Sequence, residues 1–135
     1  MGTRSRIGIQ LADESILSIY CHYDGYVSFN GVKLVEHFNS YDAAAELIDG
    51  GDISSVWTHA GWNNEVLPEV GPQYYTSRGD EYNPPRIDSN LKQYLTDGAE
   101  EYAYLFKDGE WVCYNTRSWD EKYLQQVEIP VAVAA

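Results

Sequence analysis

The side chains best suited to chemistry gather near the start of this 135-residue chain. Two segments there, residues 5–11 and 16–23, alternate apolar and polar residues as half-buried strands do. An aspartate beside a histidine can fix the imidazole tautomer for general-base work, and arginines can neutralise an anionic substrate. The predicted binding face comprises Arg4, Arg6, Tyr20, His22 and Asp24, with Arg78 reaching it from a long loop.

The same side chains also have a simpler explanation. Arg4 and Asp24, and likewise Arg6 and His22, are then only cross-strand neighbours on a solvated sheet face. No nucleophile elbow, phosphate-binding loop or paired-carboxylate motif accompanies them, so no catalytic residue is assigned. The histidines do not have metal-ligand spacing and neither cysteine lies in a CxxC pair, so we expect no metal and no cofactor.

A hairpin at residues 5–23 positions this face. A one-residue slip between its strands would turn every side chain of one strand to the wrong side. A two-residue loop at 13–14 mixes apolar and polar side chains on both faces. A loop of odd length centred on Glu14 pairs Ile9 with Ile19 and Ile7 with Cys21, which gives one apolar face. We expect this second register, with Cys21 buried and Arg6 opposite His22.

A second hairpin is predicted at residues 100–115, EEYAYLFKDGEWVCYN. Two aromatic, alternating segments flank Asp108-Gly109, a dipeptide typical of type I′ turns because both central residues need positive φ. This turn pairs Phe106 with Trp111 and Tyr104 with Cys113.

Three short helices are expected from their capping residues. Asn30 is the predicted N-cap of a helix ending near Phe38, and Ser40 of a helix over residues 41–48 that closes at Gly50-Gly51. Asp88 is the predicted N-cap of a helix that carries Leu91 and Leu95.

Together these elements predict a single α+β domain over residues 1–135. We expect a mostly antiparallel sheet built from the two hairpins, helices packed on one face, and a long irregular loop over residues 52–86. Residues 1–127 form the expected ordered core, and residues 128–135 are expected to be a frayed tail.

The composition narrows the classes of function. The formal net charge is −12, with 21 acidic and 9 basic residues, which disfavours a binder of the phosphate backbone of nucleic acids. No apolar run approaches the ~20 residues of a membrane helix. The N-terminal residues lack the pattern of a signal peptide, so Cys21 and Cys113 are expected to be reduced thiols.

Several stretches resemble a family of small proteins encoded by tailed bacteriophages, cyanophages among them. The resemblance rests on GTRSRIG at residues 2–8, IYCHYDGY at 19–26, GAEEYAYLF at 98–106 and WVCY at 111–114. It implies action in the cytoplasm of a bacterial host during infection. It carries over no catalytic residue.

Two functions follow as hypotheses. The first is a non-enzymatic accessory protein that binds and modulates or inhibits a host component, which fits the small size, the acidity and the resemblance. The second is a hydrolase, or a protein that binds a small anionic, nucleotide-like ligand, using Arg4, Arg6, His22, Asp24 and Arg78. The oligomeric state is not predicted.

Overall fold

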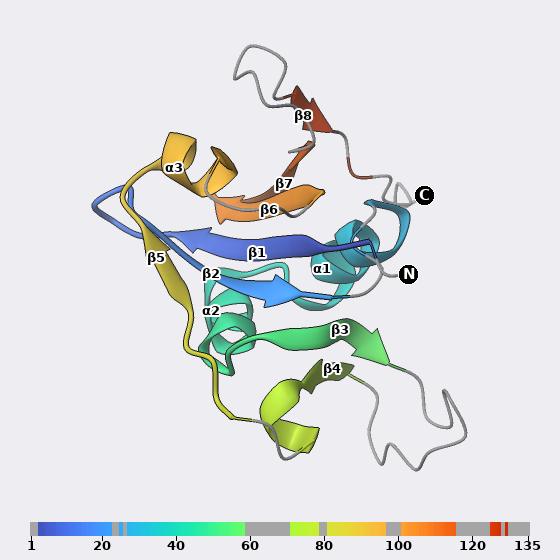
Figure 1. Ribbon diagram of the computed structural model, residues 1–135. Coiled ribbons are helices and arrows are strands. Elements are labelled where there is room, and N and C mark those ends of the chain that lie inside the picture. The colour runs from blue at the N-terminus through green and yellow to red at the C-terminus, as the bar shows by residue number, and fades with distance from the viewer. Residues whose placement is uncertain are drawn as a thin grey trace.

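One mixed sheet of eight strands joins the described parts of the chain (Figure 1). The computed structural model describes residues 3–22, 25, 27–58, 71–78, 81–96, 101–115, 125–127 and 129. The strands run in the order β4-β3-β2-β1-β6-β7-β8, and β5 pairs with β2 outside this path. Their bounds are β1 Ser5–Gln10, β2 Ile16–Cys21, β3 Ile53–Thr58, β4 Gly71–Tyr74, β5 Arg86–Asp88, β6 Tyr102–Lys107, β7 Glu110–Asn115 and β8 Gln125–Val127. The α+β class predicted from the sequence is correct.

The sheet is antiparallel except at two pairings, β1 with β6 and β2 with β3, among the described strands. Parallel pairing requires cover on both faces of the sheet, and β1 has it, since Ile7, Gly8 and Ile9 are all buried. A side chain at Gly8 would meet Ile16 Cγ2 at 2.9 Å and the Leu17 carbonyl oxygen at 3.2 Å. Glycine therefore allows β1 and β2 to pack this closely.

The first hairpin forms, but its predicted register is wrong by two residues. Ile7 pairs with Ile19 and Ser5 with Cys21, so Arg6 lies opposite Tyr20 and not opposite His22. A shift of two preserves the period-2 alternation, so each side chain keeps its predicted face. Cys21 is fully buried as expected.

The turn explains the shift, because its centre is Asp13 and not Glu14. The Glu14 N–H donates to the Leu11 carbonyl at 2.9 Å, and Glu14 itself adopts a left-handed φ of 71°. This is the turn-plus-left-handed-residue geometry of a three-residue hairpin loop. Asp13 Oδ1 fixes the turn by accepting from the Ser15 backbone N–H at 3.1 Å and from its hydroxyl at 2.5 Å.

The register of the second hairpin is confirmed. Phe106 pairs with Trp111 and Tyr104 with Cys113 across β6 and β7. Asp108 and Gly109 have φ values of 52° and 81°, as a type I′ turn requires. Here the turn residues alone determine the register, because only one pair of positions in the segment tolerates positive φ.

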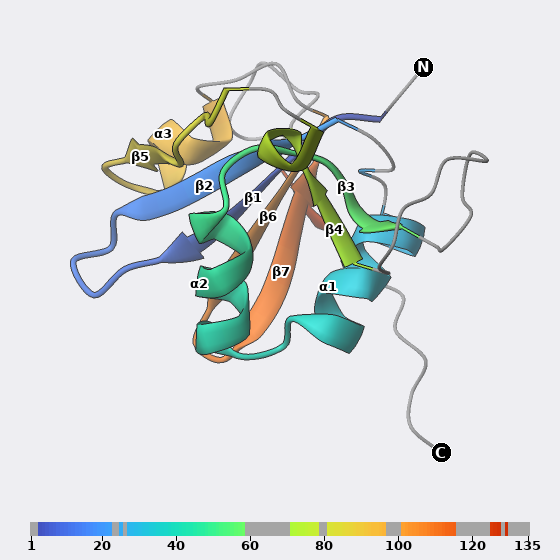
Figure 2. The ribbon, with the colours of Figure 1, turned by 90° about the horizontal axis from the view of Figure 1, so that it is seen from below.

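Helices cover both faces of the sheet, so the prediction of helices on one face is wrong (Figure 2). Helices α1 (Val32–His37) and α2 (Tyr41–Asp49) pack on the face that carries Ile7 and Ile19. Helix α3 (Leu91–Thr96) packs on the other face, where Tyr94 joins Leu105 and Tyr114 in a second apolar cluster. The reason is that residues 103–106 and 111–114 are buried without alternation, so both sides of β6 and β7 need cover.

One of the three predicted helix caps is correct. The Ser40 hydroxyl accepts from the Ala43 N–H at 3.1 Å and starts α2 as expected. Asn30 lies instead inside the π-helix Val27–Gly31 that precedes α1, with its side chain fully buried. Asp88 ends β5, and the N-cap of α3 is Asn90, whose Oδ1 accepts from the Gln93 N–H at 2.9 Å.

The region predicted to be an irregular loop, residues 52–86, contains the edge of the sheet. Strands β3 and β4 pair there with irregular register, a 3₁₀ turn follows at Tyr75–Arg78, and β5 begins at Arg86. Residues 59–70 and 79–80 lie outside the described part. So do residue 128 and residues 130–135 of the expected frayed tail, whereas Ile129 packs against the core of the α1 and α2 face.

Candidate functional site

The polar face of β1 and β2 forms, and its side chains are held by neighbours within the sheet. Arg6 Nε donates to the Ser18 hydroxyl at 3.0 Å, and Arg6 Nη2 donates to the Ser18 carbonyl at 3.1 Å. The guanidinium is thus oriented by two acceptors of one residue on the adjacent strand. Such double anchoring fixes a charged group in place, which serves a binding site and a structural bridge equally well.

Tyr20 and His22 form a hydrogen-bonded pair on the same face. The Tyr20 hydroxyl lies 2.7 Å from His22 Nδ1. With the hydroxyl as donor, Nδ1 is the acceptor and Nε2 carries the ring proton, so His22 presents an N–H donor at Nε2. With Nδ1–H as donor, the hydroxyl accepts and Nε2 is the unprotonated nitrogen that the predicted base chemistry needs.

A carboxylate completes the edge of β2 beside this pair. One edge of β2 pairs with two different strands: β5 pairs with the start of β2, and β3 pairs with it only at Cys21. Between these two pairings the Tyr20 backbone N–H donates to Asp52 Oδ1 at 2.9 Å. Asp52 therefore replaces a strand partner and holds β2 next to the segment that enters β3.

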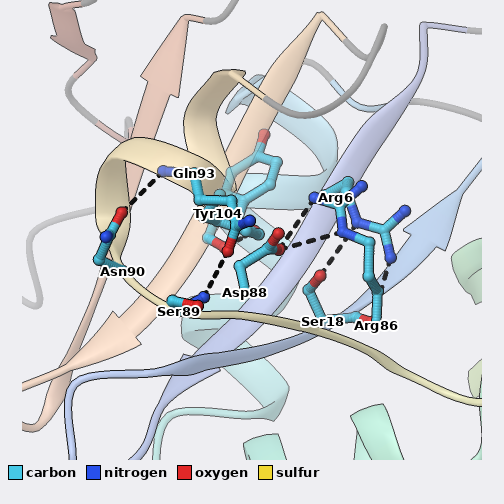
Figure 3. Close-up of polar contacts among 9 residues, drawn as sticks. Arg6, Ser18, Arg86, Asp88, Ser89, Asn90, Gln93 and Tyr104 are labelled. Carbon is cyan, nitrogen blue, oxygen red and sulfur yellow. Dashed lines mark hydrogen bonds and ion pairs between the residues drawn. The ribbon is translucent and has the colours of Figure 1, made fainter.

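Strand β5 brings Arg86 and Asp88 to this face, where the sequence analysis placed neither residue. Arg86 is the strand partner of Ser18, the residue to which Arg6 binds. Arg86 Nε and Nη2 both lie 3.0 Å from Asp88 Oδ2, and the Asp88 side chain is only 1 % exposed. Figure 3 shows the side chains of Arg6 and Arg86 next to each other, with Ser18 and Asp88 around them. Two guanidinium groups and one carboxylate leave this cluster with a net positive charge.

A signal for Arg86 and Asp88 was present in the sequence. Arg86-Ile87-Asp88 alternates polar and apolar residues directly after two prolines, as a short edge strand does. The pairing of this short strand with β2 could not be predicted from the sequence, because no nearby residue specifies which strand it pairs with.

The remaining predicted residues are only partly placed. Arg4 is exposed, and its carbonyl accepts from the Glu101 N–H at 3.0 Å. Arg78 ends the 3₁₀ turn that follows β4, at the edge of the sheet beyond β3. Asp24 lies outside the described residues. The structure thus brings together Arg6, Tyr20 and the adjacent His22, and the predicted Asp24 contact is untested.

A cleft of about 640 Å³ opens at one end of the sheet, away from the predicted face. It is lined by residues 10–12 of the first hairpin, residues 39–41 at the start of α2, and residues 106–109 of the second hairpin. Sequence reasoning missed it because a cleft between three separate turns has no local motif.

The outward side of α2 is acidic. Asp42, Glu46 and Asp49 are exposed on it, and the helix contains no lysine or arginine. Two half-exposed tyrosines lie at its ends, Tyr41 at the start and Tyr82, whose hydroxyl donates to the Asp49 carbonyl at 3.1 Å.

The negative charges of α2 affect the pKa of a tyrosine on the neighbouring strand β4. Burial, followed by the negative charges of Glu46 and Asp49, raises the pKa of Tyr74 to about 12. The Tyr74 hydroxyl donates to the Leu47 carbonyl at 2.9 Å, which holds the phenol against the helix.

Within the described residues, no group of three or more histidine, cysteine or acidic side chains is arranged to hold a metal ion. No helix of that same part of the chain is both long enough and apolar enough to cross a membrane. No protein-family model matches the sequence, and neither the curated proteins nor the solved structures give a significant match.

Proposed function

We propose that this chain is a non-catalytic accessory protein of a bacteriophage that binds and modulates a protein of its bacterial host. The phage origin and the host cytoplasm rest on the resemblance of the GTRSRIG and YCHYDGY stretches described above. The observation that carries the binding role is the outward side of α2, where Asp42, Glu46 and Asp49 form an acidic surface between two half-exposed tyrosines.

Two physical features make this surface suited to a protein partner. Tyrosine supplies a large contact area at low entropic cost, and it is enriched at the centres of interfaces. The carboxylates add to a chain of net charge −12, which speeds encounter with a basic surface and keeps acidic proteins away. A partner with a positively charged patch is therefore the expected class.

The test is capture of a host protein by the immobilised chain, followed by mass spectrometry and a stoichiometry measurement on the purified complex. Glu46→Lys reverses the charge at the middle of α2, and Glu101→Lys makes the same change of charge at the residue before β6. We expect Glu46→Lys to abolish capture, and Glu101→Lys and His22→Ala to leave it intact. Equal loss in both charge reversals would contradict a role for α2.

A second candidate function is favoured by one observation, the net positive cluster of Arg6 and Arg86 in an otherwise acidic protein. This cluster would bind a small anion, such as a nucleotide, with His22 Nε2 as an additional donor. Mass spectrometry of small molecules that remain with the purified protein tests it. A retained nucleotide that is lost in Arg6→Gln and in His22→Ala would favour this second function over the first.

A further inference from the structure

The cleft at the end of the sheet has a fixed shape, because each of its three walls is tied down. The wall at residues 106–109 is a type I′ turn, and the wall at residues 39–41 starts a helix capped by Ser40. The wall at residues 10–12 belongs to the first hairpin, where the Leu11 N–H donates to the Ser15 carbonyl at 2.8 Å. Phe106 packs edge-on against Trp111 with ring centroids 5.3 Å apart. Trp111 Nε1 in turn donates to the Phe38 carbonyl at 3.0 Å, which links the second hairpin to the segment before α2.

The interior of the cleft is suited to an apolar side chain. Leu11 and Phe106 both line the cleft: Leu11 is half-buried and exposes part of its apolar side chain, whereas Phe106 is 4 % exposed and belongs to the hydrophobic core. Tyr41 is 50 % exposed and stands at the side formed by α2. Figure 2 shows the start of α2 beside the turn that joins β6 and β7.

The rim of the cleft, meaning the exposed residues that directly follow its lining segments in the chain, is acidic. Among the lining residues themselves the charges balance, with Lys107 against Asp108. The rim adds exposed carboxylates next to all three segments: Asp13, Glu14, Asp42 and Glu110.

The start of α2 does not favour an anion in this cleft. The Ser40 hydroxyl already accepts from the Ala43 N–H, and the Asp42 carboxylate in the first turn offsets the positive end of the helix dipole. A cationic ligand is therefore complementary to the rim, and an anionic one is not.

From this geometry we propose that the cleft binds a lysine- or arginine-rich segment of a partner protein, with one apolar or aromatic side chain of that segment inserted against Leu11, Tyr41 and Phe106. The inference rests on the proposed function, since it names the partner's chemistry and the position of its anchor. Interfaces commonly concentrate their energy in one such buried anchor surrounded by a polar rim.

The test uses a synthetic pentapeptide with a central tryptophan between two basic residues on each side, titrated into the ¹⁵N-labelled protein. We expect amide shifts at Leu11, Tyr41 and Gly109, which weaken as salt is added because the rim charges are screened. A peptide with glutamates in place of the basic residues, and a basic peptide with glycine in place of tryptophan, should both fail to produce these shifts.

Matched variants separate the cleft from general acidity. Tyr41→Ala should weaken peptide binding about threefold or more, because it removes one wall of the anchor site. Ile87→Ala removes an exposed apolar side chain from β5, outside the cleft lining, and should leave binding unchanged. Shifts located elsewhere, an equal response to the acidic peptide, or equal effects of the two variants would overturn the inference.

The outcome for the cleft is distinguishable from the outcome for the proposed function. If a host protein is captured and lost with Glu46→Lys, but the basic peptide neither binds the cleft nor competes, the accessory role stands and the cleft is not its anchor. If the peptide maps to the cleft as expected while no host protein is captured, the inference about the cleft stands and the proposed function fails.

Discussion

The buried ion pair of β5 gives the sharpest prediction about stability. Arg86→Met removes the guanidinium but keeps a side chain of similar length, and Asp88→Asn removes the charge but keeps the shape. Arg86→Met removes the contact between Arg86 and Asp88 Oδ2 at 3.0 Å, and Asp88→Asn weakens it by removing the negative charge. We expect them to have unequal costs.

The inequality follows from burial. The Asp88 side chain is 1 % exposed and that of Arg86 is 28 % exposed. At 3.0 Å and an effective dielectric constant near 20, the attraction is worth about 5 kcal/mol before desolvation is subtracted. In Arg86→Met the carboxylate stays buried without that partner, a situation that typically costs about 3–5 kcal/mol. Arg6, next to Arg86 in Figure 3, offsets part of this, so we expect about 3 kcal/mol.

Asp88→Asn should cost less. The amide oxygen can still accept from Arg86, and the guanidinium that loses its counter-charge has access to water. We expect about 1–2 kcal/mol, which is the usual range for a weakened buried hydrogen bond to a charged group. The double variant Arg86→Met/Asp88→Asn should be more stable than Arg86→Met alone, because no uncompensated charge stays buried.

Equilibrium unfolding in urea, followed by tryptophan fluorescence, measures these differences when the slopes with denaturant are equal. Lys92→Met is the matched control, since it removes a positive charge from an exposed position on α3 and should change stability by less than about 0.5 kcal/mol. If Asp88→Asn costs as much as Arg86→Met, or if Arg86→Met behaves like Lys92→Met, the reasoning from burial is wrong.

Three further predictions concern turns, titration and the thiols. Gly109→Ala places a side chain at φ 81° in open space and should lower the free energy of unfolding by about 1–2 kcal/mol. Gly51→Ala, at φ 87°, brings the new carbon to 2.5 Å from the Asn83 oxygen, so it should lower the free energy of unfolding further in the same urea assay. Burial raises the pKa of the Cys113 thiol from 9.0 to about 12, and that of Tyr74 from 10.0 to about 12, so both are neutral in the folded protein when the unfolded chain ionises. The stability they contribute is complete below about pH 9 and is lost between pH 9 and 12; an unfolding midpoint unchanged up to pH 11 would be evidence against this. Cys21 and Cys113 are both buried and should react with a thiol reagent only as fast as the protein opens, so rapid labelling of native protein would show that the face assignment is incorrect.

The sequence by itself determined those features in which the interacting groups are neighbours in the chain. Asp108-Gly109 specified the second hairpin, because within residues 100–115 positive φ at two successive residues is tolerated only there. Ser40 specified the start of α2, because its hydroxyl reaches an N–H three residues later. Alternation specified which face Cys21 occupies, since a strand turns successive side chains to opposite sides.

The tertiary structure decided everything that depends on which distant segment lies alongside. Period-2 alternation is unchanged by a shift of two residues, so it could not distinguish Arg6 opposite Tyr20 from Arg6 opposite His22. The hydrogen bonds of a backbone edge are the same for any partner, so only packing could choose β6 for β1 and β5 for β2. The cluster of Arg6, Arg86 and Asp88 and the cleft at the end of the sheet both arise from these choices, because each is assembled from segments that meet only when the chain folds.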